Sequence, residues 1–296
     1  MRKNIFQGTI TALVTPFKKN HSIDFEALKK LIKFQVKSKV DAILVAGTTG
    51  ESATLTLNEK IELIAKSVEY VNGKVPVIVG TGSNSTADTI NLTTIAKELG
   101  ADAALIVAPY YNKPTQNGIF EHYRLISEKV EIPQIIYNVP GRTSINIISD
   151  TQIRLAESCP NIIGTKEASG NLGQMMEIIR HAPANFNVLS GDDALTLPSI
   201  SIGARGCVSV ISNYAPAAFG KMVNLALNNK FKEAEKLHYK LLDLMNLNFI
   251  ESNPIPVKYI LSQMGFIREI YRMPLTPLQP QSKNKINTAL KAVILK

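Results

Sequence analysis

The chain has 296 residues, of which 45% are hydrophobic and 19% charged, with two cysteines, four histidines and a formal net charge of +9 at pH 7. The apolar fraction excludes an intrinsically disordered chain, and two cysteines cannot form a disulfide framework. The histidines are scattered and no Cys-x-x-Cys pair occurs. We therefore expect no metal site, and a reducing, cytoplasmic location.

The positive charge comes mostly from lysines that recur along predicted helix faces. Within residues 24–39, lysines alternate with apolar residues, as on the solvated face of an amphipathic helix. A polyanionic partner is the alternative explanation, but no basic run is interleaved with aromatic residues. No apolar run approaches the ~20 residues of a membrane span. We expect neither a nucleic-acid nor a membrane partner, and a basic field can also attract anionic substrates.

Short apolar runs alternate with segments of helical period along most of the chain. Strands are expected at 8–14, 41–46, 75–79, 103–108, 134–137, 162–166, 186–190 and 206–211. Helices are expected between and after them at 24–39, 57–71, 86–99, 116–129, 149–158, 171–181, 193–202 and 215–227. Eight such units in about 225 residues predict an α/β fold of the (β/α)8 TIM-barrel type. A doubly wound open sheet is the competing fold, but no Gly-x-Gly-x-x-Gly follows the first strand.

The strand rhythm stops after residue 228. Helical patterns alone follow, at 230–249, 254–264 and 282–294. No low-complexity linker separates the two parts. We therefore predict a barrel with the catalytic site over residues 1–228 and a C-terminal helical region over residues 229–296.

Polar residues gather where the predicted strands end. They are residues 47–52 after the second strand, 109–112 after the fourth, 137–143 at the fifth, Lys166 and Glu167 in the sixth, and 190–193 after the seventh. In a barrel of this type the functional groups sit at the C-terminal ends of the strands. The hydroxyls, phenols, lysine and arginine of these segments are therefore expected on one rim.

Lys166 is the most informative of these residues. Period-two alternation places Ile162, Gly164 and Lys166 on one face of the strand. If that face is the barrel interior, burial favours the neutral amine, which can attack a carbonyl to form a Schiff base. The alternative is a strand-end lysine that pairs with Glu167 or reaches solvent.

The other rim residues each have a chemical and a structural interpretation. Thr48 and Thr49 lie between two glycines, in a turn that can bind a carboxylate or can simply connect two elements. Tyr137 and Tyr111 can relay protons through a threonine hydroxyl, or pack over the barrel mouth. Arg142 can hold a second carboxylate with its two-pronged guanidinium, or form a loop salt bridge.

Several segments together resemble the dihydrodipicolinate synthase family. They are residues 47–51 (Gly-Thr-Thr-Gly-Glu), 137–143 (Tyr-Asn-Val-Pro-Gly-Arg-Thr), 164–168 (Gly-Thr-Lys-Glu-Ala), 190–193, 253–258 and 274–278. The resemblance implies a Schiff-base aldolase of the N-acetylneuraminate lyase superfamily, which needs no cofactor. It implies condensation of pyruvate with L-aspartate 4-semialdehyde to 4-hydroxy-tetrahydrodipicolinate, in lysine and diaminopimelate biosynthesis.

The same resemblance assigns roles on the pyruvate side of the site. Lys166 would form the imine with pyruvate, in a pocket lined by Thr48, Thr49 and Gly191. The backbone carbonyl of Val208 would lie near the lysine.

On the side of the second substrate, the resemblance implies a proton relay made of Tyr137, Thr49 and Tyr111. Tyr111 would come from a neighbouring subunit, which implies a homo-oligomer, expected to be a dimer of dimers. Arg142 would hold the carboxylate of aspartate semialdehyde.

Feedback-inhibited members of the family bind lysine at a dimer interface. The matching positions here are Ser52, Ala53, Leu57, Lys60, Asn84, Asp88 and Tyr110. Leu57 and Lys60 stand where imidazoles are common, and Asp88 replaces the usual glutamate. Because the ammonium of Lys60 would repel an incoming lysine, weak or absent inhibition is expected.

Two other functions are alternatives for this sequence. A sister lyase acting on sialic acid or a 2-keto-3-deoxy sugar acid would share Lys166 and Tyr137. Arg142 favours the synthase, because a polyhydroxylated acceptor calls for hydroxyl-binding residues in its place. A catalytically silent, basic nucleic-acid-binding homologue is the other alternative, and the complete rim of chemical groups argues against it.

Overall fold

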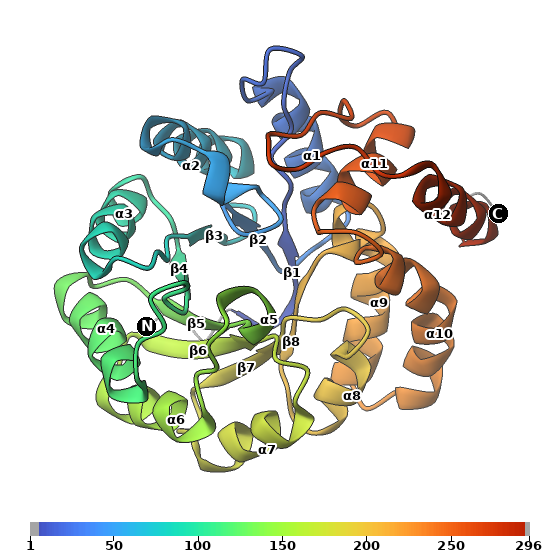
Figure 1. Cartoon of the computed structure of the whole chain (residues 1–296). Helices are drawn as coiled ribbons and strands as arrows, with labels where there is room; N and C mark the ends of the chain where they lie inside the picture. Colours follow the sequence, from blue (N-terminus) through green and yellow to red (C-terminus); the bar gives the residue numbers. More distant parts are fainter. Residues whose placement is uncertain (1–5, 294–296) are drawn as a thin grey trace.

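The strands of the structure, a computed structural model that describes residues 6–293, form a closed barrel of parallel strands ringed by helices (Figure 1). The strands are β1 (Gly8–Ala12), β2 (Ala42–Val45), β3 (Val77–Gly80), β4 (Ala103–Val107), β5 (Gln134–Asn138), β6 (Ile162–Glu167), β7 (Asn187–Ser190) and β8 (Gly206–Ser209). Each strand pairs with its neighbour in the chain, and β8 pairs with β1 to close the ring. The predicted (β/α)8 barrel is confirmed.

Most of the helices follow the predicted ranges. They are α1 (Phe25–Lys37), α2 (Leu57–Val71), α3 (Thr86–Glu98), α4 (Gln116–Lys129), α6 (Ser149–Ser158), α7 (Leu172–His181), α8 (Thr196–Ser201) and α9 (Pro216–Leu227). Three short elements were not expected from the sequence: η1 (Ser52–Thr54), α5 (Pro140–Thr143) and η2 (Ile211–Asn213). Each has only three or four residues, too few to show a helical period.

The start of α2 is fixed by a capping box. The Thr56 hydroxyl accepts a hydrogen bond from the backbone N–H of Glu59, and the Glu59 carboxylate accepts one from the backbone N–H of Thr56. This reciprocal pair satisfies two backbone donors that a helix start leaves unpaired. It therefore fixes where the helix begins, and with it the position of Lys60, which lies one residue further on.

The barrel interior is filled by inward-facing apolar side chains. They are Ile10, Ala12, Ala42, Leu44, Ile78, Ala103, Leu105, Ile135, Tyr137, Leu189 and Val208. The alternate residues of the strands pack outward against the helices. Because both faces of each strand are covered, the strands have the nearly continuous apolar character seen in the sequence.

One detail of the predicted alternation is wrong. Ile162 packs in the outer apolar cluster between strands and helices and does not share a face with Lys166. The pairing register of β5 with β6 shifts between Gln134 and Ile135, so that Ile162 faces Gln134 whereas Gly164 faces Ile135. The extra residue reverses the alternation at the start of β6, as in a β-bulge.

After the barrel come α10 (Phe231–Leu247), α11 (Ile255–Gln263) and α12 (Pro280–Val293). They lie beside α9 and α1 on one side of the barrel (Figure 1). The predicted boundary at residue 228 falls in the connection between α9 and α10, and the division into two regions stays a prediction. Within residues 6–293, no helix has the length and apolar character that would let it cross a bilayer.

Candidate active site

A small cavity lies at the C-terminal ends of the barrel strands. Its volume is about 110 Å³, and it is lined by Thr48, Thr49, Tyr137, Val139, Arg142, Lys166, Ala168, Gly191, Asp192, Phe249 and Asn253. Six of these residues were predicted as site residues from the sequence: Thr48, Thr49, Tyr137, Arg142, Lys166 and Gly191. They lie at or directly after the C-terminal ends of four strands, β2, β5, β6 and β7, and only closure of the barrel brings them to one place.

Lys166 lies at the inner surface of the barrel. It is in register with Tyr137 on β5 and Leu189 on β7, both of which face inward. The residue is 6% exposed, and its Nζ lies 4.0 Å from the centroid of the Tyr137 ring. The side chain is therefore enclosed between the two neighbouring strands and directed towards a phenol.

Glu167 faces away from Lys166 and is occupied by amides. Its carboxylate accepts hydrogen bonds from Asn138 Nδ2 at 3.0 Å, Gln152 Nε2 at 3.0 Å and Gln174 Nε2 at 2.9 Å. The alternative in which Glu167 pairs with Lys166 is therefore not what the structure shows. A buried carboxylate at this place instead ties the end of β6 to β5, α6 and α7.

Gly191 provides the space that Lys166 occupies. A Cβ atom at this position would lie 2.5 Å from the Cβ of Ala168 and 3.1 Å from the Cε of Lys166. Both distances are shorter than an ordinary carbon–carbon contact. The residue after β7 therefore has to be glycine for the lysine side chain to lie where it does.

Thr48 and Thr49 belong to a hydrogen-bonded turn after β2. The backbone N–H of Gly50 donates to the carbonyl of Gly47 at 3.1 Å, which closes the turn. Thr49 is 3% exposed, and its Oγ1 accepts a hydrogen bond from Asn253 Nδ2 at 3.0 Å. Because this lone pair of the hydroxyl is engaged, its proton is available to a group in the cavity.

Arg142 lies on the short helix α5 directly after β5. Its Nη2 donates to the backbone carbonyl of Asn253 at 3.3 Å, and no carboxylate of the described residues forms an ion pair with it. The predicted alternative of a loop salt bridge is therefore wrong. The guanidinium has donors left for an anion at the cavity mouth.

Two of the predicted residues lie elsewhere. Tyr111 is 90% exposed, has a left-handed backbone φ of 73°, and lines neither this cavity nor the larger one beside it. Val208 is buried in the barrel interior, in register with Ile10 of β1. Tyr111 could therefore contribute to a site of this kind only in a neighbouring copy of the chain, as expected from the sequence.

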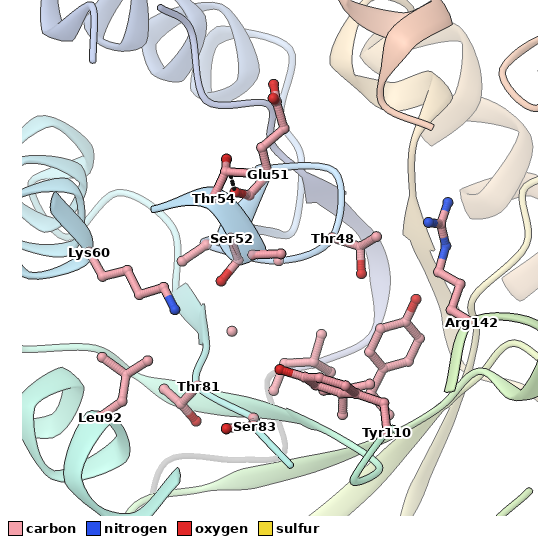
Figure 2. A pocket seen from close by; sticks show the side chains of 18 of the residues that line it. Thr48, Glu51, Ser52, Thr54, Lys60, Thr81, Ser83, Leu92, Tyr110 and Arg142 are labelled. Carbon is pink, nitrogen blue, oxygen red and sulfur yellow. Dashed lines mark hydrogen bonds between the residues drawn. The ribbon is translucent and has the colours of Figure 1, made fainter. Parts of the chain in front are cut away.

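A larger cavity of about 600 Å³ continues from the barrel mouth towards α2 and α3 (Figure 2). It brings together six of the seven predicted effector residues, namely Ser52, Ala53, Leu57, Lys60, Asp88 and Tyr110. Asn84 does not line it, and its backbone carbonyl accepts a hydrogen bond from Asn112 Nδ2 at 2.9 Å. Figure 2 shows the amine of Lys60 directed into the cavity, and burial lowers the pKa of Lys60.

The C-terminal region contributes two residues to the small cavity that were not predicted from the sequence. Phe249 follows α10 and Asn253 precedes α11, and both line the cavity. Asn253 belongs to the segment 253–258 that resembles the family, and this resemblance could have indicated a role in the site. No feature of the sequence indicated such a role for Phe249. Asp192 also lines the cavity, and its Oδ1 accepts a hydrogen bond from the backbone N–H of Ala194 at 2.8 Å.

The fold and the site define the class of protein as a (β/α)8-barrel lyase. The model of the Dihydrodipicolinate synthetase family matches residues 5–293, and the chain belongs to this family.

Individual relatives agree with this assignment over nearly their whole length. The 4-hydroxy-tetrahydrodipicolinate synthase of Aquifex aeolicus is 47% identical over 287 residues, which are 97% of each chain. A crystal structure of the Aquifex aeolicus dihydrodipicolinate synthase superposes with a TM-score of 0.95 over 97% of each chain. The enzyme of Cyanidioschyzon merolae, solved with lysine bound, is 43% identical and has a TM-score of 0.97 over 99% of this chain and 100% of that one.

Proposed function

We propose that this protein is a 4-hydroxy-tetrahydrodipicolinate synthase, which condenses pyruvate with L-aspartate 4-semialdehyde in lysine biosynthesis. The observation that carries the proposal is the enclosed Lys166, directed at the Tyr137 ring in a cavity with Thr48, Thr49 and Arg142. We propose that the reaction takes place in the cytoplasm, as expected from the scarcity of cysteine.

The first half of the mechanism takes place on pyruvate. The turn at Thr48 and Thr49 binds the pyruvate carboxylate with backbone N–H groups and hydroxyls. The neutral Lys166 amine attacks the ketone carbon, and loss of water leaves a protonated imine. The imine draws electrons from the neighbouring methyl group, so that loss of one methyl proton gives a nucleophilic enamine. Tyr137 and Thr49 carry the protons of these steps.

The second half joins the two substrates. Arg142 holds the carboxylate of aspartate semialdehyde with its remaining donors. The enamine carbon attacks the aldehyde carbon, and the new alkoxide takes a proton from the Tyr137 phenol. The substrate's own amine then displaces Lys166 from the imine, which closes the ring and restores the lysine.

The test is the initial rate of pyruvate consumption with aspartate semialdehyde, measured beside a Lys166→Ala variant. We expect a rate that is lost in the variant, together with a pyruvate adduct that borohydride traps only on the wild-type chain. A wild-type chain that traps pyruvate but does not condense it with aspartate semialdehyde would refute the synthase and favour a lyase for a sugar acid.

We further propose that the enzyme is a homo-oligomer, built from dimers that associate in pairs, in which Tyr111 completes the site of a neighbouring subunit. The exposed phenol of Tyr111, in the connection after β4 and next to the exposed Tyr110, supports this proposal. Co-expression of Lys166→Ala with Tyr111→Phe chains tests it. Mixed dimers contain one site with both intact residues, so activity should rise above that of either variant alone. Activity no higher than the sum of the two separate variants would refute the shared site.

A further inference from the structure

A completely buried ion pair joins the turn after β2 to the C-terminal region. Lys258 Nζ bonds to Glu51 Oε1, and the two side chains are 0% and 1% exposed. The other carboxylate oxygen of Glu51 accepts a hydrogen bond from the backbone N–H of Arg272 at 3.2 Å. In Figure 2 the Glu51 carboxylate points away from the cavity, so the pair does not itself contact a ligand there.

Such a pair is a costly way to fill a protein interior. Removal of two charges from water is unfavourable, and an apolar pair of similar volume is often equally stable. Burial lowers the pKa of Lys258 to about 8, against the opposing attraction of Glu51. Stability alone is therefore a weak explanation for the presence of the pair at this place.

The backbone of Glu51 shows what the pair holds in position. Its φ of 53° lies in the left-handed region, which a residue other than glycine keeps only where its surroundings impose it. The N–H of Glu51 donates to the carbonyl of Thr48 at 3.1 Å. Thr48, Thr49 and Glu51 therefore belong to one hydrogen-bonded unit, and movement of the Glu51 backbone would displace the two threonines.

The segment that leads into α11 makes a second connection to the same turn. Asn253 lies five residues before Lys258, and its Nδ2 donates to the hydroxyl of Thr49. One short stretch of the C-terminal region thus contacts both the catalytic side and the buried side of the turn.

We propose that the Glu51–Lys258 pair is a positioning device, by which α11 holds the Thr48–Thr49 turn in the geometry that binds pyruvate. The proposal rests on the proposed function, because it is the pyruvate carboxylate that the turn binds. Neither residue touches substrate, and both act through the backbone of the turn.

The test uses the full chain with Glu51→Gln, which keeps the shape of the side chain but removes the negative charge that pairs with Lys258. The readout is the pyruvate concentration that gives half-maximal borohydride trapping on Lys166, together with kcat for condensation. We expect the half-saturating pyruvate concentration to rise at least tenfold and kcat to fall about a hundredfold, the loss expected for a displacement near 1 Å. Values within twofold of wild type would overturn the proposal.

A double variant separates positioning from stability. Glu51→Met with Lys258→Met replaces the pair by apolar side chains and should restore most of the melting temperature. We expect pyruvate binding to remain weak in this variant, because the directional contact is still missing. Recovery of pyruvate binding together with the melting temperature would show that the pair is merely structural.

A second experiment tests whether Glu51 acts through the Thr48–Thr49 turn. In a Thr49→Val chain, Glu51→Gln should have less than threefold further effect on trapping, because residues that act through one another are not additive. A full, independent effect in that background would overturn the proposal.

The matched control is Lys283→Met, which breaks the Lys283–Glu269 pair at 2.9 Å elsewhere in the C-terminal region. Its trapping and kcat should stay within twofold of wild type. Trapping needs only pyruvate and Lys166, so a failure of aspartate semialdehyde as acceptor would refute the proposed reaction but leave this test intact. Absence of trapping on the wild-type chain would refute both.

Discussion

The substitution Gly191→Ala adds one methyl group at the wall that faces Lys166. The new Cβ would lie 2.5 Å from the Ala168 Cβ, 3.2 Å from the Ala168 Cα and 3.1 Å from the Lys166 Cε. Ordinary carbon–carbon contacts are ~3.5–4.0 Å, so the overlap with the Ala168 Cβ is about 1 Å. Strand β7 and residue 168 are both part of the barrel wall, and the flexible lysine side chain is the neighbour that can move most easily.

Two measurable consequences follow from this overlap. Overpacking of a core costs ~1–3 kcal/mol, which corresponds to a fall in melting temperature of roughly 2–4 °C per kcal/mol in a large domain. A reacting group displaced by about 1 Å loses ~10²-fold in rate. We therefore expect a moderately destabilised protein with about one hundredth of the wild-type rate of pyruvate trapping.

The assay is the rate of borohydride trapping at saturating pyruvate, measured beside the thermal transition. Gly220→Ala is the matched control, because its Cβ would meet no atom closer than Thr9 Oγ1 at 3.8 Å. Gly220 lies within α9, where alanine is favoured over glycine by ~1 kcal/mol, so the control should be at least as stable as wild type. A Gly191→Ala rate within threefold of wild type would refute the view that Gly191 makes room for Lys166.

Two further predictions concern the response to lysine at the larger cavity and the dependence of stability on pH. Lysine should inhibit weakly or not at all, because the Lys60 amine faces the cavity and would repel the ammonium of the ligand. The double variant Leu57→His with Lys60→His should be inhibited more strongly. Strong inhibition of the wild type by lysine at concentrations below about 1 mM, a dissociation constant typical of weak binding, would contradict this expectation. The hydrogen bond from Arg272 lowers the pKa of Glu59 from 4.5 to about 2, so the ionised pair stabilises the fold above pH 4.5 and loses that effect as the pH falls towards 2. The loss of melting temperature caused by Glu59→Gln should therefore be larger at pH 6 than at pH 3, and an equal loss at both would count against the ionic pairing.

The order of the elements was predictable because the local signals agree along the chain. Strands buried on both faces read as short apolar runs, and the helices between them show their own period. The start of β6 is the exception, since the register shift next to Gln134 turns the side chain of Ile162 towards the helices instead of the barrel interior. A change of register depends on the partner strand, and no pattern within residues 162–166 reveals it.

The identity of the side chains was enough to single out much of the candidate site. Lys166 at a strand end, the threonine turn and Arg142 after a Pro-Gly pair were predicted from residue type and position, and the structure places them around one cavity. Residue type and position did not decide whether Lys166 pairs with Glu167. Only the packing of β6 against α6 and α7 shows that Glu167 faces the amides of Gln152 and Gln174 instead.

The barrel, the polar residues at the strand ends and the family were predictable from the sequence, because strand period, strand-end position and residue type are all local properties. The tertiary structure decided which distant residues complete the site. Asn253 reaches Thr49 across 204 positions of the chain, and Lys258 reaches Glu51 across 207. Contacts of that separation depend on how the C-terminal helices pack against the closed barrel, and the local pattern on either side does not encode them.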